Sequence, residues 1–188
     1  MTHEIRKPPR EIRTERLELR SARAGDGAAL REAIAVSLED FYPWLPFSKA
    51  LGDLETMERV SRLAENSFDA DEFYVWRVWE PGGLMAGSVD LHGFDRTVPS
   101  CEIGYWLRSD RTGQGLALEF VAAAVQVAQS IIGIERIEAR CDVRNDRSWR
   151  LVERLGFSFE GIARNDERDA AGDLCSNKVY SLLRSESN

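Results

Sequence analysis

The chain reads Arg-Thr-Gly-Gln-Gly-Leu-Ala-Leu-Glu at residues 111–119, between a strand-like run at 101–107 and a helical pattern at 116–132. A glycine-rich turn that opens a helix presents several free backbone N–H groups, and the helix dipole adds partial positive charge at the same point. Gly113 and Gly115 carry no Cβ, so an anion can approach the backbone closely. The stretch therefore predicts a binding site for the phosphates of a cofactor.

Two common kinds of glycine-rich phosphate site do not match this stretch. No Gly-Lys-Ser/Thr follows the glycines, so a P-loop would lack its phosphate lysine and its magnesium hydroxyl. A dinucleotide fingerprint would need a third glycine three residues after Gly115, where this chain has Leu118. The cofactor must be identified from the rest of the chain.

The size and charge of the chain limit the classes of protein to which it could belong. Its 188 residues are enough for one domain with a substantial core. The net charge of −7 argues against a nucleic-acid partner and suits a cationic or amine substrate. The sequence contains no apolar run of about 18 residues, the length of a membrane span. Residues 1–16 also lack the apolar core of a signal peptide, so we expect a cytoplasmic protein without a membrane partner.

The cysteines and histidines are few and do not form a metal-binding pattern. An odd number of cysteines without a Cys-x-x-Cys pair predicts neither a disulfide framework nor a metal site. Cys101 and Cys141 fall on strand-like segments and are expected to be small buried hydrophobes. His3 lies in an expected tail, and His92 is expected in a surface turn, with a role as acid or base as the minor alternative.

Hydrophobic periodicity predicts one α/β domain at residues 14–184 with a mixed sheet, flanked by tails at 1–13 and 185–188. Asp26 is expected to cap the first helix, and Gly156 to end the last one. Strands are expected at 16–21, 73–79, 84–91, 101–107, 136–143, 157–162 and 178–183, and helices at 28–38, 54–68, 116–132 and 148–155.

Four motifs follow one another along the chain. They are Trp44-Leu45-Pro46, Glu102-Ile103-Gly104-Tyr105-Trp106-Leu107, Gly113-Gln114-Gly115-Leu116-Ala117-Leu118-Glu119, and Asn145-Asp146-Arg147-Ser148 followed by Leu155-Gly156-Phe157 and Glu160-Gly161. Together they resemble the GCN5-related N-acetyltransferases (GNAT), and in particular the RimJ/RimL type that acetylates the N-terminus of ribosomal proteins. The resemblance covers residues 14–183 and implies the GNAT fold, a central mixed sheet flanked by helices. It also implies acetyl-CoA as cofactor and direct acetyl transfer to a primary amine without a metal.

The chain departs from this family pattern at two positions. Thr112 stands where the family loop often has Gln or Arg, and the adjacent Arg111 could serve the phosphates instead. Ser176 stands where the branch often has Asp, four residues before Tyr180, so substrate contacts are expected to differ there.

The resemblance also implies which residues bind coenzyme A. The backbone of Leu107 and Arg108 would pair with the pantetheine arm like an added strand. Asn145 and Ser148 would lie near the thioester, although Asn145 alone also fits an Asx-turn. The loop residues that would hold the pyrophosphate, mainly through their backbone N–H groups, are Thr112, Gly113, Gln114, Gly115, Leu116 and Ala117.

Amine acetylation needs a proton acceptor for the amine and benefits from a proton for the departing thiolate. Glu102, next to Trp106, is the expected base, and the alternative is a rim carboxylate in an ion pair. Glu160 is the rival base, and its alternative is a solvated strand residue. Ser148 is the expected acid, with helix capping as its alternative. Tyr180 could replace it, although packing is the commoner role of such a tyrosine.

The acceptor site is expected at the aromatic loop, where Tyr42 and Trp44 would bind the substrate together with Glu102 and Trp106. A hydrophobic plug under the helices is the alternative, and an exposed loop would suit a homodimer surface. The favoured acceptor is a protein or peptide N-terminus. A small amine such as an aminoglycoside or a polyamine is the first alternative, and a non-catalytic acyl-CoA sensor is the second.

Overall fold

The computed structural model describes residues 6–45 and 51–186. Within these ranges the chain forms one mixed sheet with the strand order β1-β2-β3-β4-β5-β6-β8-β7. The strands are β1 (Glu11–Arg13), β2 (Glu18–Ser21), β3 (Tyr74–Trp79), β4 (Met85–Asp95), β5 (Ser100–Leu107), β6 (Arg136–Asp142), β7 (Ser158–Arg168) and β8 (Leu174–Leu183). The α-helices are α1 (Gly27–Phe41), α2 (Leu54–Asp69), α3 (Leu116–Val127), which a π-helical turn (Ala128–Ile132) continues, and α4 (Asp146–Arg154).

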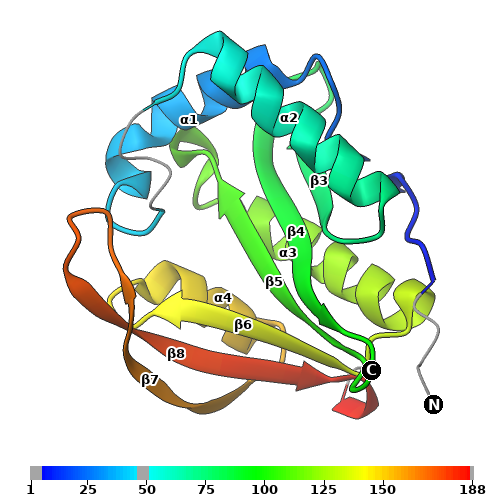
Figure 1. Ribbon diagram of the computed structural model, residues 1–188, viewed down its shortest axis with the longest axis vertical. Helices are drawn as coiled ribbons and strands as arrows, with labels where there is room; N and C mark the ends of the chain where they lie inside the picture. Colours follow the sequence, from blue (N-terminus) through cyan, green and yellow to red (C-terminus); the bar gives the residue numbers. More distant parts are fainter. Residues whose placement is uncertain (1–5, 46–50, 187–188) are drawn as a thin grey trace.

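Helices cover both faces of the sheet (Figure 1). The alternation along β5 sends Cys101 and Ile103 into the same apolar cluster as Phe120 of α3 and Val152 of α4. Leu30 of α1 belongs instead to a second cluster, against β4. The predicted α/β fold with a mixed central sheet is therefore confirmed.

Strands β5 and β6 separate, and this separation creates the site. They are the parallel neighbours of the sheet and pair only from Ser100 to Glu102 on β5. Beyond Glu102 the two strands diverge, as the green and yellow arrows of Figure 1 show. Among the described residues, the second half of β5 therefore keeps one edge without a neighbouring strand, where an extended ligand can bind.

The fold begins before the boundary that the sequence suggested. Residues 1–13 were expected to be a tail, yet β1 (Glu11–Arg13) pairs with β2. Trp76 also donates its indole N–H to the carbonyl oxygen of Pro9. A strand of three residues with charged ends is too short for a periodic pattern, which explains why the sequence did not predict it.

Two other details of the expected elements are corrected. Asp26 precedes α1 as predicted, but its carboxylate accepts from Arg20 and from the backbone of Arg23 instead of capping the helix. Strand β7 extends to Arg168 because residues 164–168 are exposed and mostly charged, which hides the alternation, and β8 begins at Leu174, four residues before the predicted start. Gly156 has a φ of 87° just after α4, so the predicted helix end is confirmed.

Within the described ranges, none of the helices has the length and apolar character needed to cross a membrane.

Candidate active site

A groove of about 560 Å³ runs between the glycine turn, the open edge of β5 and helix α4; we call it the cofactor groove. Gly113 and Gly115 have φ angles of 77° and 76°, in the left-handed region that glycine adopts without strain. A Cβ on Gly113 would meet no atom within 4 Å, so this backbone faces open space. The first hydrogen bond into the helix is donated by Glu119 N–H to Gly115 O, at 3.2 Å. The preceding N–H groups remain available for an anion, and the turn fits a pyrophosphate.

Most of the predicted loop residues line this groove, and one does not. Thr112, Gly113, Gly115, Leu116 and Ala117 are part of its wall. The wall does not include Gln114, whose carbonyl oxygen accepts a hydrogen bond of 2.9 Å from Arg16. Its side chain is therefore not supported as a cofactor contact.

An ion pair at the back of the loop holds it in place. Arg16 donates from Nε to Glu119 at 2.6 Å, in addition to its bond to the Gln114 carbonyl. Thr14 Oγ1 donates to the same carboxylate, also at 2.6 Å. Burial opposes ionisation of Glu119, but the bonds from Thr14 and Arg16 prevail and hold the pKa of Glu119 below its ordinary value. The beginning of the domain therefore fixes the loop from outside the groove.

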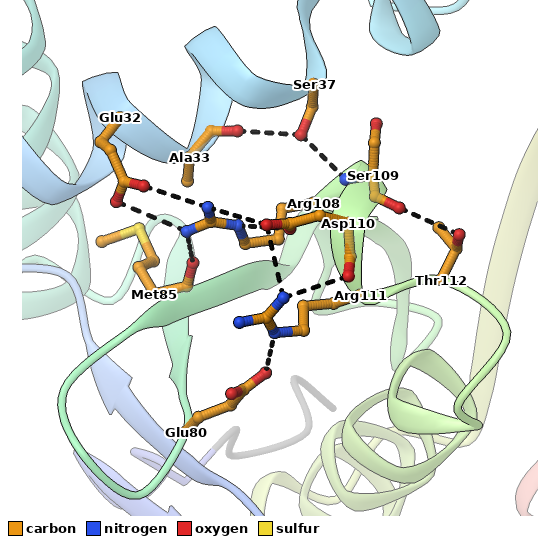
Figure 2. A network of polar contacts seen from close by, with 10 residues as sticks. All are labelled: Glu32, Ala33, Ser37, Glu80, Met85, Arg108, Ser109, Asp110, Arg111 and Thr112. Atoms are coloured by element: carbon orange, nitrogen blue, oxygen red, sulfur yellow. Dashed lines mark hydrogen bonds and ion pairs between the residues drawn. The ribbon is translucent and has the colours of Figure 1, made fainter.

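Arg108 does not have the predicted role in cofactor binding. Its backbone N–H donates to Ala86 O at 2.8 Å, and its carbonyl accepts from Arg111 N–H at 3.0 Å. Its buried guanidinium binds Glu32 and Asp110, as Figure 2 shows. Neither its backbone nor its side chain is left to pair with a pantetheine arm.

Leu107, the neighbour of Arg108, is placed as predicted. It lines the cofactor groove. Backbone groups of successive residues in an antiparallel ladder point to opposite sides. Because the Arg108 N–H points to β4, the Leu107 N–H points to the open edge of β5. Pairing of Leu107 with an extended ligand remains a prediction that this geometry permits.

Arg111 is also not supported as a phosphate ligand, because its guanidinium already pairs with carboxylates. Its Nε lies 2.8 Å from a Glu80 carboxylate oxygen, and its Nη1 lies 3.3 Å from Asp110 (Figure 2). The neighbouring Ser109 N–H donates to Ser37 Oγ of α1 at 3.0 Å. These contacts tie the turn before the glycines to α1 and to the β3–β4 hairpin.

A second cavity, of about 190 Å³, opens beside the groove; we call it the acceptor cavity. Its wall comes from β5, β6, the start of α4, the β7–β8 hairpin and the loop at 43–45. The two cavities share Trp44, Leu45, Tyr105, Asn145 and Ser148. The structure therefore brings these five residues to one junction, and the sequence had predicted Trp44, Asn145 and Ser148 as site residues.

Ser148 is the central group of this junction. Asn145 caps α4 by accepting from Ser148 N–H at 3.2 Å, so the alternative capping role is filled by Asn145. Ser148 Oγ lies 3.0 Å from Tyr105 OH and donates to Cys141 Sγ at 3.2 Å. Burial raises the pKa of Tyr105, so its phenol keeps its proton over the ordinary pH range.

Tyr105 is the site residue that the sequence reasoning missed. The sequence analysis named it only as part of the motif at 102–107, because alternation shows the face of a strand and not the position of a hydroxyl. The sequence did contain one signal for its role: Tyr105 directly follows Gly104 on the strand that leads to the cofactor loop.

Glu102 lines the acceptor cavity, and its carboxylate is paired with the side chain of His92. His92 Nε2 lies 3.6 Å from Glu102 Oε1, and its Nδ1 lies 2.8 Å from Asp90 Oδ1. The bond with Asp90, followed by that with Glu102, raises the pKa of His92 to about 10. His92 is therefore positively charged at neutral pH. It lies within β4, which corrects the prediction that it belongs to a surface turn.

Glu160 is not a suitable rival base. Arg136 donates two hydrogen bonds to it, at 2.6 and 2.7 Å, and Ser181 a third at 2.7 Å. The Arg136 bonds, followed by the Ser181 bond, lower the pKa of Glu160 to about 2. It lines neither cavity. Tyr180 also lines neither, and its hydroxyl donates to Glu153 at 2.8 Å.

The predicted aromatic residues are distributed differently from the expectation. Trp44 lines both cavities, whereas Trp106 lines only the cofactor groove, edge-to-face with Phe41 at 5.5 Å. Tyr42 is exposed and lines neither cavity, so it is not supported as a substrate contact. Phe47, like His3, lies outside the described residues, and the homodimer suggested by this loop stays a prediction.

Comparison with known proteins identifies the class. The family model for the "Acetyltransferase (GNAT) domain" matches residues 16–158, most of the chain. The chain belongs to the GNAT acetyltransferases. The [Ribosomal protein uS5]-alanine N-acetyltransferase of Escherichia coli is 28% identical over 170 residues, which cover 84% of this chain and 83% of that protein. The predicted family and the enzyme class are therefore confirmed, and the similarity to this relative supports the predicted RimJ/RimL branch.

Solved structures agree with the fold. The structure described as "RimL- Ribosomal L7/L12 alpha-N-protein acetyltransferase in complex with Coenzyme A" has a TM-score of 0.86 at 21% identity, over 92% of this chain and 97% of that chain. The microcin C7 self-immunity acetyltransferase MccE, in complex with acetyl-CoA and AMP, has a TM-score of 0.83 at 19% identity, over 94% and 98%. The family and these complexes bear out the prediction of acetyl-CoA as the cofactor.

Proposed function

We propose that this chain moves the acetyl group of acetyl-CoA to the N-terminal amino group of a protein, and that it does so in the cytoplasm. The junction of the two cavities at Ser148 and Tyr105 carries the proposal. A groove with a phosphate-binding turn at one end meets a cavity that contains Glu102, so donor and acceptor can meet without a covalent enzyme intermediate. The E. coli relative, named for the alanine of a ribosomal protein, supports an acceptor of this class.

The cofactor groove provides binding groups for two parts of acetyl-CoA. The free N–H groups from Gly113 to the first turn of α3 suit the pyrophosphate. The open edge of β5 at Leu107 suits the amide groups of the pantetheine arm. Bound acetyl-CoA supplies the thioester that the amine attacks.

Glu102 is the proposed proton acceptor for the amine, directly or through one water molecule. An ammonium group cannot attack a carbonyl, so the amine must lose its proton first. Glu102 lines the acceptor cavity, and His92 holds it at 3.6 Å from the opposite side. The histidine limits the positions of the carboxylate and leaves its other oxygen for the substrate.

Ser148 and Tyr105 are the proposed proton donors for the departing sulfur. The Ser148 hydroxyl donates to Cys141 Sγ, and Tyr105 OH, 3.0 Å from Ser148 Oγ, donates to the Ser148 carbonyl. Rotation about its C–O bond would direct the proton of either hydroxyl towards the departing sulfur. A serine hydroxyl is a weak acid in water, so this role depends on the fixed geometry of the pair.

The carboxylates of the acceptor cavity do not favour a small polycation. Asp142 and Asp169 both pair with Arg144, at 2.7 and 3.1 Å. Glu167 accepts from Asn177 at 3.0 Å. Because Asp142 and Asp169 both hold Arg144, a polyamine would have to compete with this arginine to pair with them, whereas a single amino group needs only Glu102.

The test is release of free thiol from acetyl-CoA with three kinds of acceptor. Short peptides with a free N-terminus are compared with the same peptides blocked at the N-terminus, and with spermidine and an aminoglycoside. We expect turnover on the free peptides only, with the acetyl group located on the N-terminal residue by mass spectrometry. Equal turnover on blocked peptides would assign the activity to lysine side chains, and turnover on spermidine alone would overturn the proposal.

A further inference from the structure

Three arginines of α4 line the cofactor groove, and the activity described above assigns them no role. Arg147, Arg150 and Arg154 are spaced by three and four residues, so they lie along one face of the helix. The same wall contains a single carboxylate among the described residues, that of Asp40. A cationic groove is unexpected in a chain whose net charge is −7, so this charge needs a specific explanation.

Two of these arginines are available for a ligand. In the part of the chain that the structure describes, neither Arg147 nor Arg154 has a carboxylate within ion-pair distance. Arg150 lies 3.5 Å from Asp146, and its guanidinium lies over the Trp149 ring at 5.3 Å. By contrast, Arg108 and Arg111 beside the same groove are fully engaged with carboxylates.

We propose that the α4 arginines, Arg147 and Arg154 above all, bind the 3′-phosphate of coenzyme A. The backbone turn already provides for the pyrophosphate, which leaves the phosphomonoester on the ribose as the second anionic group of the ligand. A phosphomonoester carries a charge of about −1.5 to −2 at pH 7. Backbone N–H groups alone do not neutralise it, whereas the guanidinium fork binds phosphate oxygens in pairs.

The arrangement of α4 agrees with this assignment. Ser148 lies at the junction, where the thioester is expected, and Arg154 lies in the last turn of the helix. Six residues of helix correspond to about 9 Å along its axis. The three arginines line the cofactor groove and not the acceptor cavity, so they are placed for the nucleotide part of the donor and not for an acceptor.

Calorimetric titration with coenzyme A and with 3′-dephospho-coenzyme A tests the proposal without any acceptor. We expect the wild-type protein to bind coenzyme A about tenfold more tightly, because an ionic hydrogen bond contributes at least this factor. The Arg147→Gln/Arg154→Gln double variant should reduce that preference to less than about twofold, with an unchanged dissociation constant for the dephospho form.

Arg164→Gln is the matched control. It removes the same charge per substitution, but Arg164 is exposed on β7 and lines neither cavity. The Arg164→Gln variant should prefer coenzyme A to 3′-dephospho-coenzyme A by the same factor as the wild type.

Two results would overturn the proposal. Equal binding of both ligands by the wild-type protein would do so without any variant, so the test does not depend on the folding of a variant. An equal loss of affinity for both ligands in a double variant with the wild-type melting temperature would show that the arginines act elsewhere. Neither result bears on the acceptor, so failure here is distinct from failure of the proposed N-terminal acetylation.

Discussion

The cofactor groove and the acceptor cavity meet at Ser148 but are built in different ways. The phosphate end of the groove consists of backbone, with Gly113 and Gly115 before the first turn of α3. The acceptor cavity consists of side chains from five separate segments, and ion pairs such as that of Asp142 with Arg144 form part of its wall.

This difference has consequences for both sites. A backbone-built site depends on a few glycines and on the position of a helix start, and most side chains around it can change. A side-chain-built site depends on which charged groups pair and therefore on many positions at once. Substitutions at glycine should act on cofactor affinity alone, and substitutions of cavity residues should act on turnover alone.

The largest expected effect tests the phosphate end of the cofactor groove, which is built from backbone. Gly115→Glu places a side chain and a negative charge where the phosphates bind, and it strains a φ of 76°. We expect the dissociation constant for coenzyme A, measured by calorimetry, to rise by more than about 100-fold.

Gly82→Glu is the matched control, since Gly82 also has a positive φ, 108°, with no atom within 4 Å of a new Cβ. It lies in the β3–β4 hairpin and away from both cavities. Unchanged affinity in Gly115→Glu, or the same loss in Gly82→Glu, would remove the glycine turn from the cofactor site.

The second largest effect tests the acceptor cavity, which is built from side chains. Glu102→Gln keeps the size of the side chain and removes the proton acceptor, so turnover should fall by roughly 100-fold. Affinity for coenzyme A should stay the same, because Glu102 lines only the acceptor cavity. Glu160→Gln, at a residue bound to Arg136, should leave turnover nearly unchanged in the same steady-state assay. A fall in turnover for Glu160→Gln and none for Glu102→Gln would reverse the assignment.

The contrast between the two sites also explains what the sequence could predict. The glycine turn, its helix and the preceding strand are contiguous in the chain, so local pattern was enough to place them. Ser148 and Asn145 were found through the motif at the start of α4. The mixed sheet was predicted from the alternation of strands and helices, and of its strands only the three-residue β1 was missed.

Partners that are distant in sequence could not be predicted. Arg108 and Arg111 looked free in the sequence, but their carboxylate partners Glu32 and Glu80 lie 76 and 31 residues away. Cys175 and Asn177 line the acceptor cavity only because β7 and β8 form a long hairpin. No spacing rule shows which arginine will find a carboxylate after folding, so the charges of this site had to come from the structure.

A smaller effect is expected at the junction itself. Tyr105→Phe keeps the ring and removes the hydroxyl that lies 3.0 Å from Ser148 Oγ. We expect kcat to fall by roughly tenfold, with little change in the KM for acetyl-CoA. Tyr180→Phe makes the same chemical change where the hydroxyl binds Glu153, and kcat should not change. An equal effect of both variants on kcat would indicate loss of packing, and would remove Tyr105 from the proton pathway.

The smallest effect concerns the pH dependence that only the side-chain-built site should show. The pKa of His92 rises from 6.5 to about 10, so its pairing with Asp90 and Glu102 stabilises the fold fully below pH 6.5 and is lost as the pH rises through 10. Because the His92 side chain is 37% exposed, solvent screening limits the effect of His92→Gln to about 1 kcal/mol at pH 6.

Urea unfolding of wild type and His92→Gln at pH 6 and above pH 10 measures this difference. We expect the gap in unfolding free energy to shrink at the higher pH. A gap that stays constant would instead reflect the edge contact of the imidazole with Phe73, whose ring centroid lies 5.7 Å away. Since the glycine turn contains no titrating group, affinity for coenzyme A in His92→Gln should remain equal to that of the wild type at pH 6. The acceptor cavity alone would then depend on the charge of His92.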